Sequence, residues 1–332
     1  MVWVMRGIGR YGSSMEPAET GFALHGSGTG ISAAGEFRST QGLLPASLTF
    51  PAGAFRQLEF SYEPALRTAW CFMKPEGTPR FTMSLMDELN YLHGELAKVS
   101  DPALGDADAA PKFYVGGSRV PGVFNLGGDL QLFIECIRRG DAATLRNYAR
   151  NCIRISHDMD KSIDGRVITI CVIQGDALGG GLEGALSFNH LIVEKDARVG
   201  LPESLFNVFP GMGAYSFLSR KIGTVRAREL MIKGELFTGQ QLHQMGLVTA
   251  LAENGRGIEV ARDFIAKNLR RHNLLTSMEK IRRRVHPVSF DELEDITSIW
   301  VDTAMSLSKQ DLRRMEVLMS AQVRKKAPLT GE

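Results

Sequence analysis

An α/β layered domain followed by an all-helical region is the fold class that this sequence predicts. Between residues 56 and 252, apolar runs rich in β-branched residues alternate with segments of helical periodicity. Such alternation is typical of a sheet covered by helices. After residue 252 only the helical periodicity continues. With 332 residues, 44% of them hydrophobic and 23% charged, the chain can form one large domain with a substantial core.

Local patterns predict the elements of the α/β part in order. Strands are expected over residues 67–73, 112–115, 166–173 and 190–194, and a helix over residues 83–99. The run at 166–173 is continuously apolar or β-branched, which suits a strand buried on both faces. Asp141 suits the N-cap of a further helix, whose apolar residues share one face: Leu145, Ala149, Cys152 and Ile153.

The two ends of the chain differ from this middle part, residues 56–252. Residues 1–55 are rich in Gly, Ser, Ala and Thr and are expected to form a flexible extension. Residues 253–332 are expected to be helical, with helices at 258–269, 275–284, 290–307 and 310–325. This region is too short to complete a core alone, so it should pack on its own body or on a neighbouring subunit.

Composition excludes several classes of function. The 39 basic and 37 acidic residues give a net charge of +2, which is too balanced for binding to nucleic acid or a membrane surface as the main role. No stretch approaches the roughly 20 apolar residues of a membrane span, and the N-terminal apolar run is too short for a secretory signal. We therefore expect a cytoplasmic protein. Its four cysteines form no Cys-x-x-Cys pair and should be reduced.

Two glycine-rich turns each precede an expected helix. In the first, Gly127 and Gly128 precede a helix that begins at Asp129. Glycine lets backbone approach a ligand closely, and a helix start offers unpaired N–H groups to a negative oxygen; the alternative is a tight turn with an Asp N-cap. In the second, residues 179–181 are all glycine and Glu183 follows. The alternative there is a capping loop with an acid near the helix start, and Gly-x-Gly-x-x-Gly of dinucleotide sites is absent.

Glu203 follows Pro202 in a third segment, residues 200–203. An isolated glutamate is usually a solvated surface residue. Here the neighbours are apolar: Leu201, Leu205, Phe206, Val208 and Phe209. A carboxyl in apolar surroundings has a raised pKa, which suits proton transfer near neutral pH.

Taken together, residues 124–130, 177–183 and 201–203 resemble the enoyl-CoA hydratase (crotonase) superfamily in order and spacing. More narrowly, residues 124–130, 201–203 with 209–217, and 299–305 resemble the diffusible-signal-factor synthases, which make cis-2-unsaturated fatty-acid signals for bacterial quorum sensing. The resemblance covers roughly residues 57–325 and leaves the N-terminal extension aside.

The resemblance implies a crotonase-like spiral of ββα units with a C-terminal all-helical region. It implies that Glu183 and Glu203 are catalytic and that Gly128 and Gly180 form an oxyanion hole. It also implies an acyl pocket lined by Met212, Trp300 and Leu318; core packing is the alternative for these three. Trimers or hexamers are expected, with the helical region contributing to oligomerisation and to closure of the pocket.

The implied reaction is dehydration of a 3-hydroxyacyl thioester on acyl carrier protein, followed by thioester hydrolysis. The phosphopantetheine of acyl carrier protein or CoA would carry the substrate, with no further cofactor and no metal. The alternative is an ordinary enoyl-CoA hydratase/isomerase. A sensor-kinase partner is a second role that the resemblance allows. The basic runs at 280–284 and 324–326 are expected to be solvated helix faces, with an acyl-carrier-protein docking patch as the alternative.

Overall fold

The computed structural model describes residues 48, 50, 51, 53–104 and 110–324, with backbone alone for 321–324. The described residues belong to one compact unit. Most of the expected extension, residues 1–55, lies outside them. Its last part does not behave as an extension, because Leu48 is buried and Phe50 and Phe55 pack against the core. The packed body therefore begins a few residues earlier than predicted.

Ten strands in this part of the chain form two sheets. The six-stranded sheet has the order β1 (Leu58–Glu63), β2 (Thr68–Met73), β3 (Phe113–Ser118), β5 (Ile168–Ile173), β7 (His190–Glu194) and β10 (Ala250–Ala252). The four-stranded sheet has the order β4 (Val123–Asn125), β6 (Asp176–Leu178), β8 (Arg198–Gly200) and β9 (Leu236–Thr238). The outermost pairs β1–β2 and β8–β9 are antiparallel, and the others are parallel.

Each turn of the chain supplies one strand to each sheet. β3 is followed by β4, β5 by β6 and β7 by β8, and the first strand of every pair joins the larger sheet. Helices complete the turns, with α2 (Leu130–Arg139) and α3 (Ala142–Asp160) after the first pair and α5 (Gly180–Leu186) after the second. The predicted α/β spiral of ββα units with C-terminal helices is confirmed.

The larger sheet is covered on both faces. Ile168, Ile170 and Val172 of β5 face the cluster to which α9 (Gly257–Asn268) contributes, whereas Cys171 and Ile173 face the main core. α1 (Met83–Val99) and α3 supply much of that main core. Burial on both faces is what the continuous apolar run of this strand predicted.

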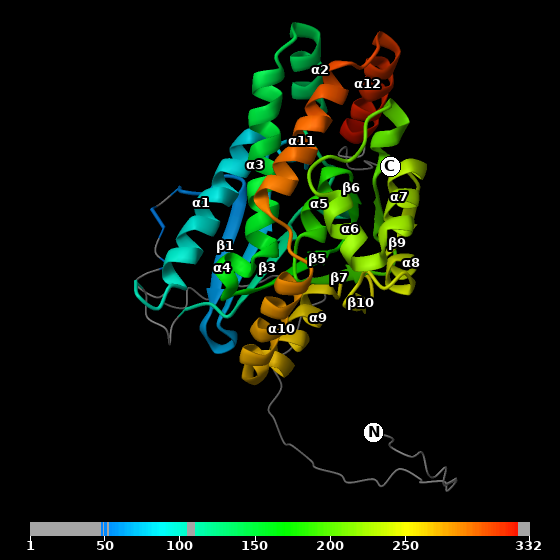
Figure 1. Cartoon of the computed structure of the whole chain (residues 1–332). Coiled ribbons are helices and arrows are strands. Elements are labelled where there is room, and N and C mark those ends of the chain that lie inside the picture. Colours follow the sequence, from blue (N-terminus) through cyan, green and yellow to red (C-terminus); the bar gives the residue numbers. More distant parts are fainter. Residues whose placement is uncertain (1–47, 49, 52, 105–109, 325–332) are drawn as a thin grey trace, which may run out of the picture. The chain divides into compact units, whose positions relative to one another are not determined.

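The C-terminal helices pack on their own body. α11 (Phe290–Met305) lies along α3, and α12 (Lys309–Arg324) contacts α2 and the 3-10 helix η3 (Pro202–Phe206) (Figure 1). α10 (His272–Val285), preceded by the short η4 (Leu269–Arg271), contacts α4 (Ser162–Gly165). The predicted helices agree with α9–α12 to within a few residues. No helix in the described ranges is long and apolar enough to span a bilayer.

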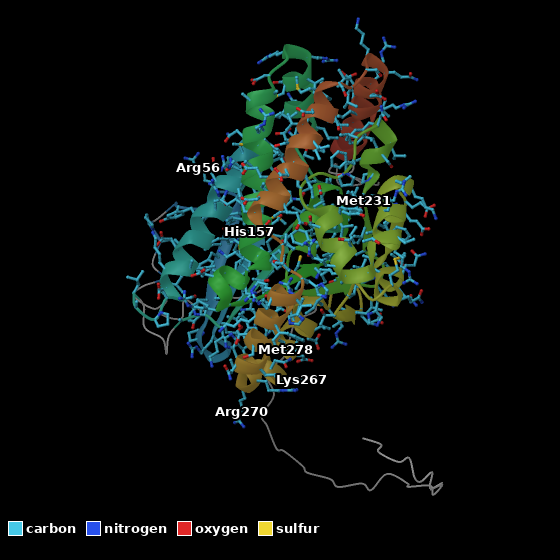
Figure 2. All side chains as sticks on the ribbon, viewed as in Figure 1. Arg56, His157, Met231, Lys267, Arg270 and Met278 are labelled. Atoms are coloured by element: carbon cyan, nitrogen blue, oxygen red, sulfur yellow. The ribbon has the colours of Figure 1, made fainter. Side chains whose placement is uncertain are left out.

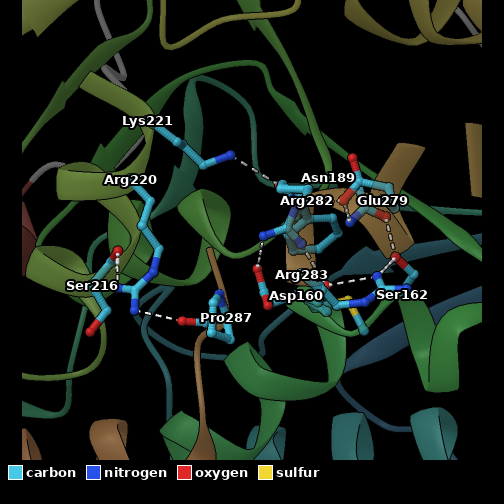
Figure 3. Close-up of polar contacts among 12 residues, drawn as sticks. Asp160, Ser162, Asn189, Ser216, Arg220, Lys221, Glu279, Arg282, Arg283 and Pro287 are labelled. Atoms are coloured by element: carbon cyan, nitrogen blue, oxygen red, sulfur yellow. Dashed lines mark hydrogen bonds and ion pairs between the residues drawn. The ribbon is translucent and has the colours of Figure 1, made fainter. Parts of the chain in front are cut away.

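A polar cluster joins α10 to the body (Figure 3). The Arg282 guanidinium lies 2.9 Å from the buried Asp160 carboxylate, and Arg283 donates to Ser162 Oγ at 2.8 Å. Asn189 donates to Glu279 at 3.1 Å. Arg282 and Arg283 are half-buried and bonded to the body, so the predicted solvated face is wrong for these two residues.

α10 also carries an outward row of exposed apolar side chains. Leu274, Met278, Ile281 and Val285 are each between 47% and 62% exposed, and Met278 is labelled in Figure 2. Their spacing places them on one helix face. The row is the part of the helical region best suited to the predicted contact with another subunit, which stays a prediction.

Several elements have no counterpart among the predictions. They are β1, η2 (Pro64–Leu66), α6 (Ala214–Ile222), α7 (Thr224–Lys233), α8 (Gly239–Gln244) and the three-residue strands β4, β6 and β8–β10. A three-residue strand is too short to show alternation, and α7 has only two buried residues. Their positions depend on tertiary contacts that local periodicity does not encode.

Candidate active site

One cavity of about 280 Å³ brings together all seven residues assigned to the site from the sequence. Gly128, Gly180, Glu183 and Glu203 line it, and so do Met212, Trp300 and Leu318. Most of the remaining lining is apolar, and about half of it comes from α2, α3, α11, α12 and η3. A largely apolar cavity with a few convergent polar groups is the usual form of a small-molecule site.

The Gly128 and Gly180 amides lie side by side. A Cβ on Gly180 would lie 3.4 Å from Gly128 N, and a Cβ on Gly127 would lie 3.2 Å from Gly180 N. Neither amide donates a hydrogen bond to another group within the described ranges. Gly127 has φ +101°, a conformation that strongly favours glycine. Two adjacent free donors on a cavity wall can bind one oxygen that gains negative charge.

Side chains hold the Gly127–Gly128 turn in place. Asn125 Oδ1 accepts from Gly127 N at 2.8 Å. The Tyr148 hydroxyl accepts from Asp129 N at 3.1 Å and donates to Phe81 O at 2.7 Å, so it joins the turn to the neighbouring chain. Asp129 also caps α2 as predicted, accepting from Leu132 N. The amide direction at Gly128 is therefore set by partners on several elements.

Glu183 is a buried carboxyl without a cation. It is 2% exposed, and its Oε1 accepts from Met212 N at 2.7 Å and Ala214 N at 3.2 Å. Within the described residues no Lys or Arg forms an ion pair with it. Burial raises its pKa to about 7, although the two backbone donors favour the ionised form.

Glu203 lies on η3 and points its carboxyl at Gly179. A Cβ on Gly179 would lie 2.3 Å from Glu203 Oε1, so only glycine allows this approach. The residue is half-buried as a whole, but its Oε2 is enclosed and has no hydrogen-bond partner in the described part of the chain. Burial and then the nearby Glu183 charge raise the pKa of Glu203 well above its ordinary value. With Glu183 better stabilised as the anion, Glu203 is the carboxyl that holds a proton.

The three pocket residues contribute apolar side chains to the cavity wall. Trp300 is 4% exposed and packs against Gly211, where an added Cβ would meet the indole at 2.3 Å. Its ring contacts Phe133 edge to face at 5.2 Å between centroids. Met212 is buried and Leu318 is half-buried. Core packing and pocket lining are therefore compatible for these residues, because each also contributes to the main core.

Comparison with known proteins adds a family to this geometry. Residues 112–319 match the sequence profile of enoyl-CoA hydratase/isomerase. The match includes both glutamates, both glycines and all three pocket residues. The chain belongs to the enoyl-CoA hydratase/isomerase family.

Relatives within the family agree with this assignment. The chain is 32% identical over 145 residues to a probable enoyl-CoA hydratase of Bacillus subtilis (strain 168), covering 43% of this chain and 54% of the relative. It is 30% identical over 156 residues to the mitochondrial methylglutaconyl-CoA hydratase of Mus musculus, covering 45% and 48%. The aligned segment thus spans about half the length of these relatives.

Solved structures show the same fold. An enoyl-CoA hydratase from Bacillus halodurans matches with a TM-score of 0.65 at 18% identity, over 79% of this chain and all (100%) of that chain. DspI of Pseudomonas aeruginosa matches with a TM-score of 0.59 at 20% identity, over 80% of this chain and 97% of that one.

Two features of this family member's site were missed in the sequence. Tyr148, which holds the Gly127–Gly128 turn, looks like any apolar-face residue of α3, since a hydroxyl bond to backbone leaves no sequence signal. The Met212 and Ala214 groups that bind Glu183 are backbone N–H groups, and the sequence of side chains does not show where a backbone N–H points. The local sequence signal is Gly213, which lies between Met212 and Ala214. It has φ +114°, a conformation that glycine adopts readily.

Proposed function

We propose that this enzyme dehydrates a 3-hydroxyacyl thioester and then hydrolyses the thioester, releasing a cis-2-unsaturated fatty acid that serves as a quorum-sensing signal. The observation that carries the proposal is the meeting, in one largely apolar cavity, of two carboxyls that have no ion pair among the described residues and of two amides without acceptors there. Acid–base work on carbon needs a proton acceptor and a proton donor at one place, and an oxygen site for the enolate.

The dehydration uses one proton shared by the two glutamates. The free protein starts with Glu203 protonated and Glu183 ionised, because the Met212 and Ala214 amides stabilise the Glu183 anion, whereas Glu203 Oε2 has no hydrogen-bond partner in the described part of the chain. In the reaction the ionised carboxyl removes the C2 proton and the protonated carboxyl gives its proton to the departing C3 hydroxyl, which leaves as water. The thioester oxygen, negative in the enolate, binds the Gly128 and Gly180 amides. Loss of one such donor typically costs about 3–4 kcal/mol of transition-state stabilisation.

Hydrolysis can follow at the same amides. A carboxylate of the pair removes a proton from water, and the resulting hydroxide attacks the thioester carbonyl. The two amides then stabilise the tetrahedral oxygen, and the thiol departs with a proton from the acid of the pair. The half-exposed position of Glu203, beside otherwise buried groups, gives water a route to the carboxyls.

The narrower assignment, signal synthesis, is supported by the segment that resembles the signal-factor synthases. Residues 209–217 supply both amides that bind Glu183 and the glycine on which Trp300 packs. The segment at 209–217, which resembles the signal-factor synthases, is therefore part of the site. The second candidate, an ordinary hydratase or isomerase of fatty-acid metabolism, is favoured by the names of the relatives.

Product analysis separates the two candidates. Purified protein is supplied with 3-hydroxyacyl thioesters on acyl carrier protein and on CoA, and the products are analysed by mass spectrometry and chromatography against cis and trans standards. A free cis-2 acid that is absent with Glu183→Gln supports the proposal. A trans-2-enoyl thioester with no free acid would contradict it and favour the hydratase.

Acyl-chain choice should depend on Trp300. Trp is large and rigid and Met is adaptable, so Trp300→Ala is expected to shift preference toward longer chains, whereas Met212→Ala mainly weakens binding. The measurement is turnover across substrates of about eight to sixteen carbons, a range that a pocket of ordinary size could enclose. An unchanged length profile in a folded Trp300→Ala protein would place Trp300 in core packing alone.

Assembly and location stay proposals. We propose a homotrimer or hexamer in the cytoplasm, with the exposed α10 row at a subunit contact. Ile281→Asp should then reduce the mass found by light scattering, while Leu104→Asp, at another exposed apolar position, should not. A sensor-kinase partner is the second role that the resemblance allows, and co-purification with and without the Ile281→Asp change tests it.

A further inference from the structure

The exposed residues of the cavity lining mark an opening to the surface. Of the residues that line it, only Arg198, Leu205 and Leu236 are exposed; Leu205 is 51% and Leu236 43% exposed. They lie on β8, η3 and β9, and β8 pairs with β9 through Gly200 and Leu236. Glu203 is two residues from Leu205, so the mouth is directly beside the proposed acid–base pair.

A surface groove continues from this mouth. It is lined by Leu205 and by one side of α12, namely Gln310, Arg313, Arg314, Val317 and Leu318. Leu205 and Leu318 line both the groove and the cavity, so the two are contiguous. Val317 is 66% exposed, and with Leu205 it gives the groove an apolar floor between charged rims.

The rims present cations while the neighbouring acids are recessed. Arg314 is 53% exposed and its partner Asp311 10%; Arg198 is 52% exposed and its partner Asp176 13%. Arg313 has no ion pair among the described residues. Glu316, the next acid on α12, is engaged by Arg138. The exposed Glu235 is an acid at the mouth itself. The groove side of the opening is therefore cationic around an apolar strip.

We propose that this groove docks a small acidic carrier protein, so that its phosphopantetheine arm passes Leu205 into the cavity. This rests on the proposed thioester function and names the face that receives the carrier. Arginine forks bind phosphate and carboxylate in a bidentate manner, and complementary charge raises association rates. The arm delivers the thioester to the Gly128 and Gly180 amides, while its phosphate and the acidic carrier remain outside with Arg313 and Arg314.

The test uses a charge reversal and a control of equal charge change. Arg313→Glu with Arg314→Glu alters the groove, and Lys267→Glu with Arg270→Glu alters an exposed site at the far end from α12 (Figure 2). Each protein is assayed with the same 3-hydroxyacyl group on acyl carrier protein, on CoA and on N-acetylcysteamine, which has neither phosphate nor protein. The groove variant should lower the ratio of kcat/KM for the carrier-protein substrate to that for the N-acetylcysteamine substrate by about tenfold or more.

The other outcomes of the assay each have a defined meaning for the proposal. An unchanged ratio, or the same fall in the control, removes the groove from docking. A fall for CoA as large as that for carrier protein shows recognition of phosphate alone. If the wild type turns over none of the substrates, the proposed function fails, and docking is then judged by fluorescence anisotropy of labelled holo-acyl carrier protein. There, the groove variant should weaken binding about tenfold at low salt, and the wild-type affinity should fall as salt rises; absence of wild-type binding would overturn it.

Discussion

The protein buries acidic side chains in two regions that differ in what accompanies the charge. Asp160 is 4% exposed and has Arg282 at 2.9 Å, in a cluster that joins α10 to the body (Figure 3). Glu183 is 2% exposed and accepts from two backbone N–H groups, and the nearby Glu203 has an enclosed oxygen without a hydrogen-bond partner in the described part of the chain. Asp160 thus has a cationic partner, whereas the two glutamates lie close enough to interact and have no ion pair in the described part of the chain.

This difference separates a structural acid from a chemical one. Both kinds of site carry the cost of removing a carboxyl from water. Near Asp160 the Arg282 guanidinium offsets part of that cost and joins the helical tail to the body, although Asp160 Oδ2 has no hydrogen-bond partner in the described part of the chain. In the cavity two backbone N–H groups offset part of the cost at Glu183, and burial still raises the pKa of both glutamates, as acid–base catalysis requires. The predictions below test this separation.

The largest expected effect is loss of turnover in Glu183→Gln and Glu203→Gln. Each change removes a proton acceptor or donor while keeping side-chain shape. Turnover should fall about 100- to 10,000-fold, the usual contribution of general acid–base groups, with the circular-dichroism spectrum unchanged. The measurement is steady-state kinetics on a 3-hydroxyacyl thioester. Near-wild-type turnover in either folded variant would remove that residue from the chemistry.

The opposite result is expected for Asp160→Asn. Arg282 and its neighbours lose the charged partner that fixes α10, at a cost of about 1–3 kcal/mol of unfolding free energy. Since Asp160 does not line the cavity, kcat at a temperature where the variant is folded should stay within about twofold. Chemical denaturation and kinetics on the same sample check both statements. A stable but inactive variant would mean that the two regions are not separable.

Protein stability should also depend on pH through the unpaired pair. The pKa of Glu183 is raised from the ordinary 4.5 to about 7, so between these values the folded protein binds more protons than the unfolded chain. Stability from this group is complete below about pH 4.5 and falls as pH rises toward about 7. Glu183→Gln lacks this loss, so its melting temperature relative to wild type should rise from about pH 5 to about pH 8. A constant difference across that range would show that Glu183 has an ordinary pKa.

The sequence predicted one of these two regions and missed the other. Glu183 and Glu203 were singled out because glycine-rich turns and a proline mark them in the chain and because the apolar neighbours of Glu203 indicate a raised pKa, and the resemblance to the enoyl-CoA hydratase superfamily then assigned them as the catalytic pair. Asp160 carries no such signal. It lies at the end of a helix, its partners on α10 are over a hundred residues away, and a long-range ion pair leaves no local pattern.

The same limit applies to the fold. Long elements with clear periodicity were predicted well: the bounds of α1 agree, β5 begins two residues later than expected, and the N-terminus of α3 follows Asp141 as predicted. The run at 280–284 was not, because whether a basic residue faces solvent or a buried aspartate depends on the docking of α10. The local sequence determines where a helix or strand forms. Tertiary packing determines whether each of its faces contacts solvent or the rest of the protein.

The smallest expected effect is a change in kcat when the backbone around the Gly128 amide loses a side chain that holds it. In the cavity a neutral group, the Tyr148 hydroxyl, fixes Asp129 N and Phe81 O around the Gly128 amide. Tyr148→Phe removes both bonds and keeps the ring that packs on Phe133. Because the oxyanion amide then moves without being lost, kcat should fall about three- to tenfold, well below the roughly 100-fold or more expected on losing a donor, while KM stays nearly constant. The matched control is Tyr62→Phe, a change at a buried tyrosine outside the cavity lining, which should leave kcat unchanged. If Tyr148→Phe instead raised KM at constant kcat, the hydroxyl would serve substrate binding, and the direction of the Gly128 amide would have to be set by Asn125 and Phe81 alone.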